Sequence, residues 1–215
     1  MEDILDVYAQ EPDPLRPRLC FDERPCLMIG DVTSPIAMKA GKPKKIDYEY
    51  IHGQAVVALL AYNMDTGQRH VVISDTKTKM DYATYFKWLL ETHYPNVKGI
   101  KLIQDNLNTH TKGSFYKAFP PKEARELVKK IEFHFTPKHG SWLNMAEMEF
   151  AALSTQCLSR RIPDKETFVK EVKAWEVRRN AKATKINWSF TIDLAQEKFK
   201  RHYEIVCKKE DILCQ

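Results

Sequence analysis

Apolar residues recur along the chain in two patterns: short β-branched or aromatic runs predict strands, and three-to-four-residue spacings predict helices. The predicted strands are 19–21, 26–29, 55–62, 70–74, 100–104 and 131–135. The predicted helices are 1–10, 81–94, 114–130 with a break at Pro120-Pro121, 144–160, 164–181 and 190–203. Segment 64–67 predicts a hairpin turn, and segment 30–47, with its prolines and four lysines, predicts a basic loop.

This order of elements favours an α/β fold, a mixed sheet flanked by helices on both faces. The 215 residues are enough for one domain with a substantial core. Acidic side chains that follow strands then meet at one edge of the sheet, where α/β proteins place their sites.

Charge is unevenly spread along the chain. The net charge is +5, yet residues 1–15 carry five acids and no Lys or Arg, which leaves 34 basic against 24 acidic residues in the rest. A basic body suggests a polyanionic partner such as nucleic acid.

The five cysteines form no CxxC pair and show no zinc-ligand spacing, which fits buried thiols in a reducing cytoplasm. The first fifteen residues are acidic, unlike a signal peptide. No run approaches the roughly 18 apolar residues of a membrane span. We therefore expect a cytoplasmic protein without a membrane partner.

Three acids carry the candidate chemistry. Asp22 and Asp105 end apolar, strand-like runs, and Glu147 opens a predicted helix after the segment 136–146. Three carboxylates placed in this way can hold two divalent metal ions, the apparatus for cutting and joining phosphodiesters. Oxygen ligands of this kind suit Mg²⁺.

Each acid also has a structural interpretation. Asp22 and Asp105 are typical of turns at strand ends, and Glu147 would complete a capping box if Asn144 caps the helix. Glu149 competes with Glu147, because the two lie about equally far from the centre of the apolar stripe on opposite sides. Periodicity does not choose between them.

Basic and aromatic residues give weaker indications. Arg and Lys side chains can track a DNA backbone, although solvated helix faces and loops are the default interpretation. His110 is expected either near the Asp105 site or at the start of a helix, and Trp142, Trp175 and Trp188 are expected in the core rather than as base-stacking groups. The candidate DNA contacts are Lys39, Lys42, Lys44, Lys45, Lys138, His139, Arg160, Arg161, Arg178 and Arg179.

Six blocks of sequence together resemble one family. They are FDERP at 21–25, DYEY at 47–50, DNLNTH at 105–110, FHFTPKHGSWLNMAEME at 133–149, CLSRRIPD at 157–164 and AWEVRRN at 174–180. The chain resembles the DDE transposases of bacterial insertion sequences in the mariner superfamily, specifically the IS-six-thirty branch. The DNLNTH and TPKHGSWLNMAE blocks in this order are the most specific part of the match.

The resemblance implies an RNase H-like fold and metal-dependent DNA strand cleavage and strand transfer. It implies Asp22, Asp105 and Glu147 as catalytic residues and metal ligands, with two Mg²⁺ ions that Mn²⁺ can replace. The family pattern Leu-Asn-x-x-Glu falls on 143–147 and so favours Glu147 over Glu149. The implied domains are an acidic helix and linker at 1–16, the catalytic domain at 17–205 and a tail at 206–215.

Two departures qualify the resemblance. Members of the family carry an N-terminal helix-turn-helix region, whereas this chain begins at a segment that resembles the linker helix before the catalytic domain. Segment 51–54 also differs from the expected Arg-Asn-Gly-Thr. We therefore expect a catalytic domain alone, whose partners are transposon-end and target DNA, a second copy of itself and a separate helix-turn-helix polypeptide.

Two other functions compete with a transposase. One is a non-catalytic DNA-binding remnant, and the other is a stand-alone RNase H-like nuclease without a joining step. The intact set of three acids favours an enzyme over the remnant, and only the missing end-binding region favours these alternatives.

Overall fold

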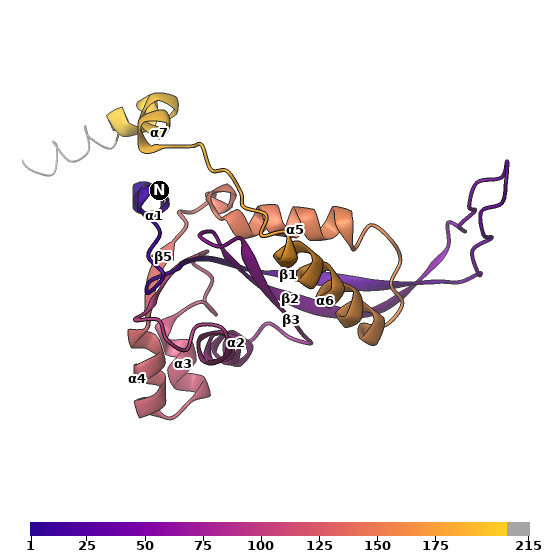
Figure 1. Cartoon of the computed structure of the whole chain (residues 1–215), viewed down its shortest axis with the longest axis horizontal. Coiled ribbons are helices and arrows are strands. Elements are labelled where there is room, and N and C mark those ends of the chain that lie inside the picture. The colour runs from indigo at the N-terminus through magenta and orange to yellow at the C-terminus, as the bar shows by residue number, and fades with distance from the viewer. Residues whose placement is uncertain (206–215) are drawn as a thin grey trace, which may run out of the picture.

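A computed structural model describes residues 1–205 and shows one five-stranded sheet (Figure 1). The strand order is β3-β2-β1-β4-β5, in which β1 is antiparallel to β2 and parallel to β4. β2 and β3 are antiparallel, and β4 and β5 are parallel. The strands are β1 (Arg18–Asp31), β2 (Tyr50–Asn63), β3 (Gln68–Ser74), β4 (Ile100–Gln104) and β5 (Ile131–Phe135).

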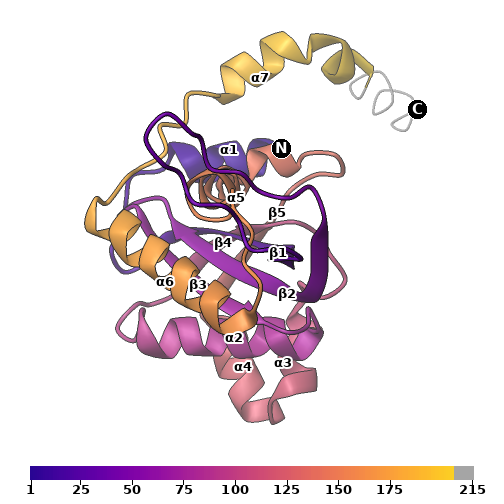
Figure 2. The ribbon, with the colours of Figure 1, turned by 90° about the vertical axis from the view of Figure 1, so that its right-hand side faces the viewer.

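Helices cover both faces of the sheet, as expected for the predicted α/β class (Figures 1 and 2). One face carries α2 (Lys79–Thr92), α3 (Lys112–Ala118) and α4 (Pro121–Lys129). The opposite face carries α1 (Glu2–Ala9), α5 (Met145–Gln156) and α6 (Lys165–Ala181). A 3₁₀ turn, η1 (Ser141–Leu143), precedes α5, and α7 (Ile192–Lys198) lies near α1.

The central strands are apolar on both faces because both faces are covered. Along β2, Val57 and Leu59 pack against the α2 side while Ala58 and Leu60 pack against the α5 side. This alternation follows from the two-residue period of a strand. Cys20, Cys26 and Cys157 are buried free thiols, and Cys207 and Cys214 lie outside the described residues.

β1 differs from the prediction. It is one strand of 14 residues, and the expected break at residues 22–25 is wrong. β4 pairs only with Arg18–Cys20, so from residue 21 onward this edge of β1 has no neighbouring strand among residues 1–205, although the Ile29 N–H donates to the Ile162 carbonyl at 2.9 Å. Pro25, which has no N–H to donate, is tolerated beside such an open edge.

The predicted basic loop at 30–47 is displaced by two residues along the chain and projects from the sheet (Figure 1). Strands β1 and β2 run on to Asp31 and from Tyr50, and residues 32–49 form an arm that extends beyond the sheet (Figure 1). Two isolated bridges, Ile36 with Lys45 and Lys39 with Lys42, hold the arm together.

Most other predicted elements are confirmed. β4 and β5 have the predicted bounds, and the predicted proline break separates α3 from α4. α5 ends at Gln156 rather than 160, and α7 covers only part of the predicted 190–203 helix. No helix within residues 1–205 combines the length and the apolarity that crossing a bilayer requires. The expected tail at 206–215 lies outside the described residues.

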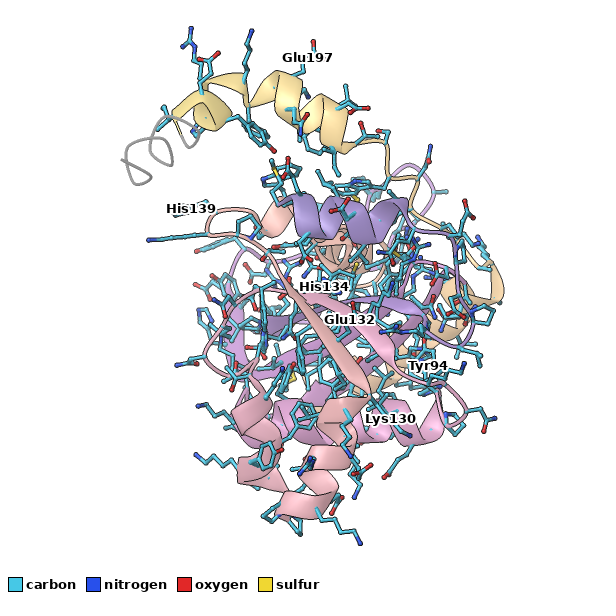
Figure 3. The ribbon with its side chains drawn as sticks, turned by 90° about the vertical axis from the view of Figure 1, so that its left-hand side faces the viewer. Tyr94, Lys130, Glu132, His134, His139 and Glu197 are labelled. Carbon is cyan, nitrogen blue, oxygen red and sulfur yellow. The ribbon has the colours of Figure 1, made fainter. Side chains whose placement is uncertain are left out.

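Helix α1, expected as a linker, packs into the core of the domain. Its Tyr8 hydroxyl donates to the Leu143 carbonyl at 2.6 Å, beside the start of α5. Its Asp3 carboxylate lies 2.9 Å from Nδ1 of His134 on the edge strand β5 (Figure 3). The buried side chains of α1 are Ile4, Leu5 and Val7.

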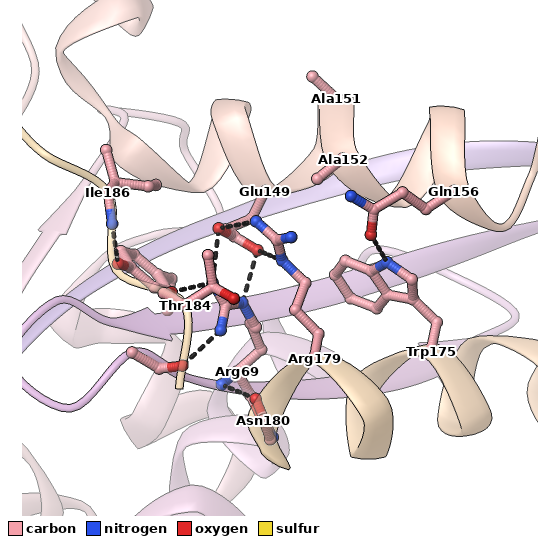
Figure 4. Close-up of polar contacts among 12 residues, drawn as sticks. Arg69, Glu149, Ala151, Ala152, Gln156, Trp175, Arg179, Asn180, Thr184 and Ile186 are labelled. Atoms are coloured by element: carbon pink, nitrogen blue, oxygen red, sulfur yellow. Dashed lines mark hydrogen bonds and ion pairs between the residues drawn. The ribbon is translucent and has the colours of Figure 1, made fainter. Parts of the chain in front are cut away.

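A buried ion network joins α5 to the sheet and to α6 (Figure 4). The fully buried Glu149 carboxylate accepts from Arg69 of β3 at 2.6 and 2.8 Å and from Arg179 of α6 at 2.8 and 3.0 Å. Burial alone would raise the pKa of Glu149, but the two guanidinium groups outweigh it and hold that pKa below its usual value. Glu149 is therefore an ionised anchor for the helix.

Replacing Glu149 by Gln should leave two guanidinium groups without a counter-charge inside the protein. We expect the free energy of unfolding in urea to fall by about 3–5 kcal/mol. Glu147→Gln, two residues away on the exposed side of the same helix, should cause no loss. A fall below about 1 kcal/mol for Glu149→Gln would show that the network does not hold α5.

Candidate active site

Strand register brings two of the three acids to the same level. Cys20 of β1 lies opposite Ile103 of the parallel strand β4, and both side chains face α5. Asp22 lies two residues after Cys20, and Asp105 lies two residues after Ile103. The register therefore predicts that both acids lie at the same level and on the same face of the sheet. Glu147 lies in the first turn of α5, the helix that covers this face.

Asn144 connects the start of α5 to β1. Its Oδ1 accepts from the Ala146 N–H at 3.1 Å, and its Nδ2 donates to the Phe21 carbonyl at 2.8 Å. Phe21 directly precedes Asp22, so this buried amide ties the helix to the strand beside the first acid. Asn144 is the predicted N-cap, but within residues 1–205 the Glu147 side chain makes no hydrogen bond that would complete a capping box.

The three carboxylates interact electrostatically. Burial raises the pKa of Asp22 to about 7, and the negative charges of Glu147 and Asp105 act in the same direction. The Glu23 N–H, which donates to Asp22 Oδ1 at 2.8 Å, and the His110 ring oppose this shift. Ionising Asp22 is therefore unfavourable unless a positive charge joins the site.

His110 is the cationic partner of the second acid. Its Nδ1 lies 2.5 Å from Asp105 Oδ1, its Nε2 lies 3.5 Å from Glu23 Oε2, and its ring stacks on Tyr82 at 4.9 Å. Burial alone would lower the pKa of His110, but its hydrogen bond to Asp105 and the negative charges of Asp105 and Glu23 outweigh burial and raise it to about 9. The same contact holds the pKa of Asp105 below its usual value, although burial acts the other way.

Glu23 is a site residue that the sequence analysis did not single out. Its side chain is buried on the α2 side of β1, between His110 and Lys77, whose Nζ lies 3.8 Å from Glu23 Oε1. The available signal was strand alternation, which places Glu23 on the face opposite Asp22. Glu23 and Asp105 thus share the positive charge of one histidine.

Ten candidate DNA contacts fall into three groups. Three arginines have partners within the protein: Arg179 of α6 binds Glu149, and in the connection between α5 and α6 Arg160 binds Glu171 and Arg161 binds Asp31 at 2.7 Å. Arg178 is exposed on α6, as are Lys138 and His139 in the loop before α5. The four lysines lie on the exposed arm, which starts at Asp31, roughly 30 Å of extended strand from Asp22.

The tryptophans divide between core and surface. Trp175 is buried, and its indole N–H donates to Gln156 Oε1 at 3.0 Å (Figure 4). Trp188 is half-buried against the core, but Trp142 is 43% exposed, so its expected place in the core is wrong. It lies in η1, which leads directly into the helix that carries Glu147.

The carboxylate set suits a hard divalent cation in chemistry but is not a closed ligand cage. Within residues 1–205, no three Asp, Glu, His or Cys side chains are grouped tightly enough to surround an ion. Burial, together with the negative charges of Glu147 and Asp105, raises the pKa of Asp22, and this is the structural observation that favours a cation at this place.

The raised pKa of His110 makes stability depend on pH in a defined window. The unfolded-state pKa is near 6.5 and the folded-state value is about 9, so its contribution is complete below pH 6.5 and is lost as pH rises to 9. In EDTA, the unfolding free energy should fall more steeply across this window for the native chain than for His110→Gln. The control His139→Gln should follow the native curve, and equal slopes for all three would contradict a protonated His110.

Comparison with known proteins identifies a family and solved structures of similar fold. Residues 17–169 match the model of the family described as DDE superfamily endonuclease. A pre-cleavage Mos1 transpososome matches with a TM-score of 0.54 at 13% identity, over 84% of this chain and 56% of the other chain. The Mos1 strand transfer complex matches with a TM-score of 0.56 at 13% identity, over 84% and 55%. A search of curated protein sequences finds no significant match.

The structural likeness concerns the fold, which is RNase H-like, as the resemblance implied. The chain spans little more than half the length of the Mos1 chains it matches. The family model covers well over half of the 215 residues, including Asp22, Asp105 and Glu147. The chain therefore belongs to the DDE superfamily of endonucleases.

Proposed function

We propose that this chain is the catalytic domain of a DNA transposase that cleaves DNA strands and transfers them to a target. One observation carries the proposal: Asp22 and Asp105 follow register-matched positions of two parallel strands, beneath the helix whose first turn holds Glu147. Membership of the DDE endonuclease superfamily supports this role for the three acids. Mos1, the structural neighbour, forms paired-end and strand transfer complexes.

Asp22, Asp105 and Glu147 would hold divalent cations, Mg²⁺ by expectation with Mn²⁺ as a substitute. One Mos1 paired-end complex was solved with Mn. Two bound cations would activate the attacking oxygen and stabilise the leaving oxygen of an in-line phosphoryl transfer. Phosphoryl transfer of this kind depends mainly on positioning and charge neutralisation, which fits a site built on strands and a capped helix.

The surrounding residues prepare the acids for this role. His110 keeps Asp105 ionised and oriented, and Asn144 fixes the distance between the start of α5 and the strand residue before Asp22. Since the pKa of Asp22 is about 7 without a cation, protons and cations should compete for Asp22, and cation binding should weaken as pH falls below 7.

We also propose a branch of the transposase family for this chain and a separate region for the recognition of transposon ends. The six sequence blocks support the IS-six-thirty branch, and recognition of transposon ends is assigned to a helix-turn-helix region outside this chain. Lys138 and His139, which are exposed in the loop before α5, are the best placed of the basic candidates to meet phosphate near Glu147, whereas the exposed Arg178 lies beside Gln156 at the other end of α5. Because α1 packs into the core, we place it within the catalytic domain rather than in a free linker.

Conservative replacement of each acid should weaken cation binding and leave the chain folded. Asp22→Asn, Asp105→Asn and Glu147→Gln should each lower Mn²⁺-dependent nicking of duplex DNA by more than about a hundredfold, since loss of supporting groups alone costs 10–100-fold. Glu126→Gln, an exposed change on α4, is the matched control. Nicking is measured on supercoiled plasmid, with circular dichroism as the check on folding.

The outcome also separates the competing functions. Retained nicking in any of the three acid variants would remove that residue from the catalytic set. Nicking without transfer of a pre-cut 3′ end would favour the stand-alone nuclease, and DNA binding without nicking would favour the remnant.

The arm at residues 32–49 favours a second copy of the chain as a protein partner. Residues 32–49 project from the sheet and expose large apolar side chains, among them Met38 at 75% and Tyr48 at 85% (Figure 1). Several large apolar side chains exposed on one projecting segment are typical of a protein interaction site. We therefore propose that the arm reaches a second copy of the chain.

Removing the apolar side chains of the arm should prevent this association. The combined variant Ile36→Ser, Met38→Ser and Tyr48→Ser should sediment as a monomer at concentrations at which the native chain sediments as a dimer. The matched variant Lys39→Ser, Lys42→Ser and Lys44→Ser removes charge from the same arm and should remain dimeric. A native chain that is monomeric throughout would contradict the proposed association.

A further inference from the structure

An aromatic cleft lies beside the third acid. It consists of two adjoining hollows of about 690 and 410 Å³ that share Trp142 and Phe199 as a common wall. The loop 137–143, the first two residues of the chain, the segment 187–190 and residues between 198 and 203 line it. Clefts of this size are typical of ligand sites.

The cleft begins next to the proposed chemistry. Met148, which lines the smaller hollow and is 46% exposed, directly follows Glu147 in α5. Trp142 stands edge-on to Phe190, with ring centroids 5.2 Å apart, and stays 43% exposed. Within residues 1–205 the indole N–H of Trp142 has no hydrogen-bond partner. The contact with Phe190 holds the ring in place, and its exposed part is free to contact a ligand.

The rim of the cleft is mainly positive. Lys138 and His139 lie at the larger hollow, and His139 projects from the loop after β5 at the end of the molecule that also carries α7 (Figure 3). Lys198 Nζ lies 5.7 Å above the Phe190 ring. The one acid in the lining, Glu2, already accepts from Gln196 and Tyr203.

Aromatic rings surrounded by basic residues are the means by which proteins hold unpaired nucleic acid strands. The bases stack on the rings irrespective of sequence, and the basic residues follow the backbone. A second protein copy would gain little from the positive rim, whereas a polyanion gains from it directly. Because the cleft adjoins the turn of α5 that carries Glu147, an unpaired strand bound in it would lie beside the proposed cleavage site.

We propose that unpaired bases of the DNA strand adjoining the scissile phosphate stack in this aromatic cleft, with Trp142 as the stacking surface. The inference rests on the proposed DNA-cleaving function, which it deepens by assigning a place to the substrate strand. Trp142 is a binding residue in this account and takes no part in the chemical step.

The test compares single-stranded and duplex oligonucleotides of one sequence, by fluorescence anisotropy with the full chain in EDTA. Trp142→Ala should weaken single-strand binding by roughly five- to a hundredfold and leave duplex binding within about twofold. Trp142→Phe should restore most of the loss. Tyr116→Ala removes a 48% exposed ring from α3 on the opposite face and should change neither affinity.

A second readout locates the bases. A 2-aminopurine next to a pre-formed nick should be quenched by the native chain and by Trp142→Phe, but not by Trp142→Ala. Equal single-strand affinity for Trp142→Ala and the native chain would overturn the proposal. An equal loss of affinity for single-stranded and duplex DNA would also overturn it. So would a Trp142→Ala variant that changes its oligomeric state and keeps its affinity for single-stranded DNA.

The binding test is run in EDTA, so its outcome does not depend on the metal-dependent nicking that tests the proposed function. Acid-dependent nicking together with an unaffected Trp142→Ala would refute the cleft and leave the transposase. Trp142-dependent single-strand binding in a chain that never nicks DNA would support the cleft and refute the transposase.

Discussion

The buried ion network of Glu149 is the interaction on which the geometry of the site depends. Apolar packing resists separation of α5 from the sheet, but it is non-directional and only weakly opposes rotation of the helix. A carboxylate gripped by Arg69 and Arg179 is directional, because rotation would break four charge-assisted hydrogen bonds at once. Glu147 is two residues away, about 200° around the helix. Fixing the direction of Glu149 therefore also fixes the direction of Glu147.

Asn144 supplies the second fixed point of the same helix. Its amide joins the first turn of α5 to the strand residue before Asp22, so the first and third acids share one rigid frame. The second acid is oriented from the other face of the sheet, through His110 and the Tyr82 ring of α2. The three acids thus depend on three separate parts of the core. A change in either helix layer would reach the site through the side chain that anchors it.

How far the sequence predicted this arrangement depends on the range of the interactions involved. Strands β4 and β5 and the proline break after α3 follow from local pattern, and their bounds were predicted correctly. The break in β1 was wrong because the open edge that tolerates Pro25 arises from pairing with a strand about 80 residues away. Periodicity left Glu147 and Glu149 equivalent for the same reason, since the arginines that distinguish them come from β3 and α6. Trp142 was assigned to the core on residue type alone.

The two faces of the sheet differ in how their acidic charge is balanced. Glu23 on the α2 side and Asp105 share the positive charge of His110, and Lys77 lies near Glu23. On the α5 side, Asp22 and Glu147 have no salt-bridge partner among residues 1–205, and the pKa of Asp22 is raised as a result of burial and repulsion. A polyanionic DNA strand would be repelled by this face as it stands. Cations that neutralise the carboxylates would remove that repulsion, so the same imbalance that destabilises the empty face would make DNA binding depend on metal.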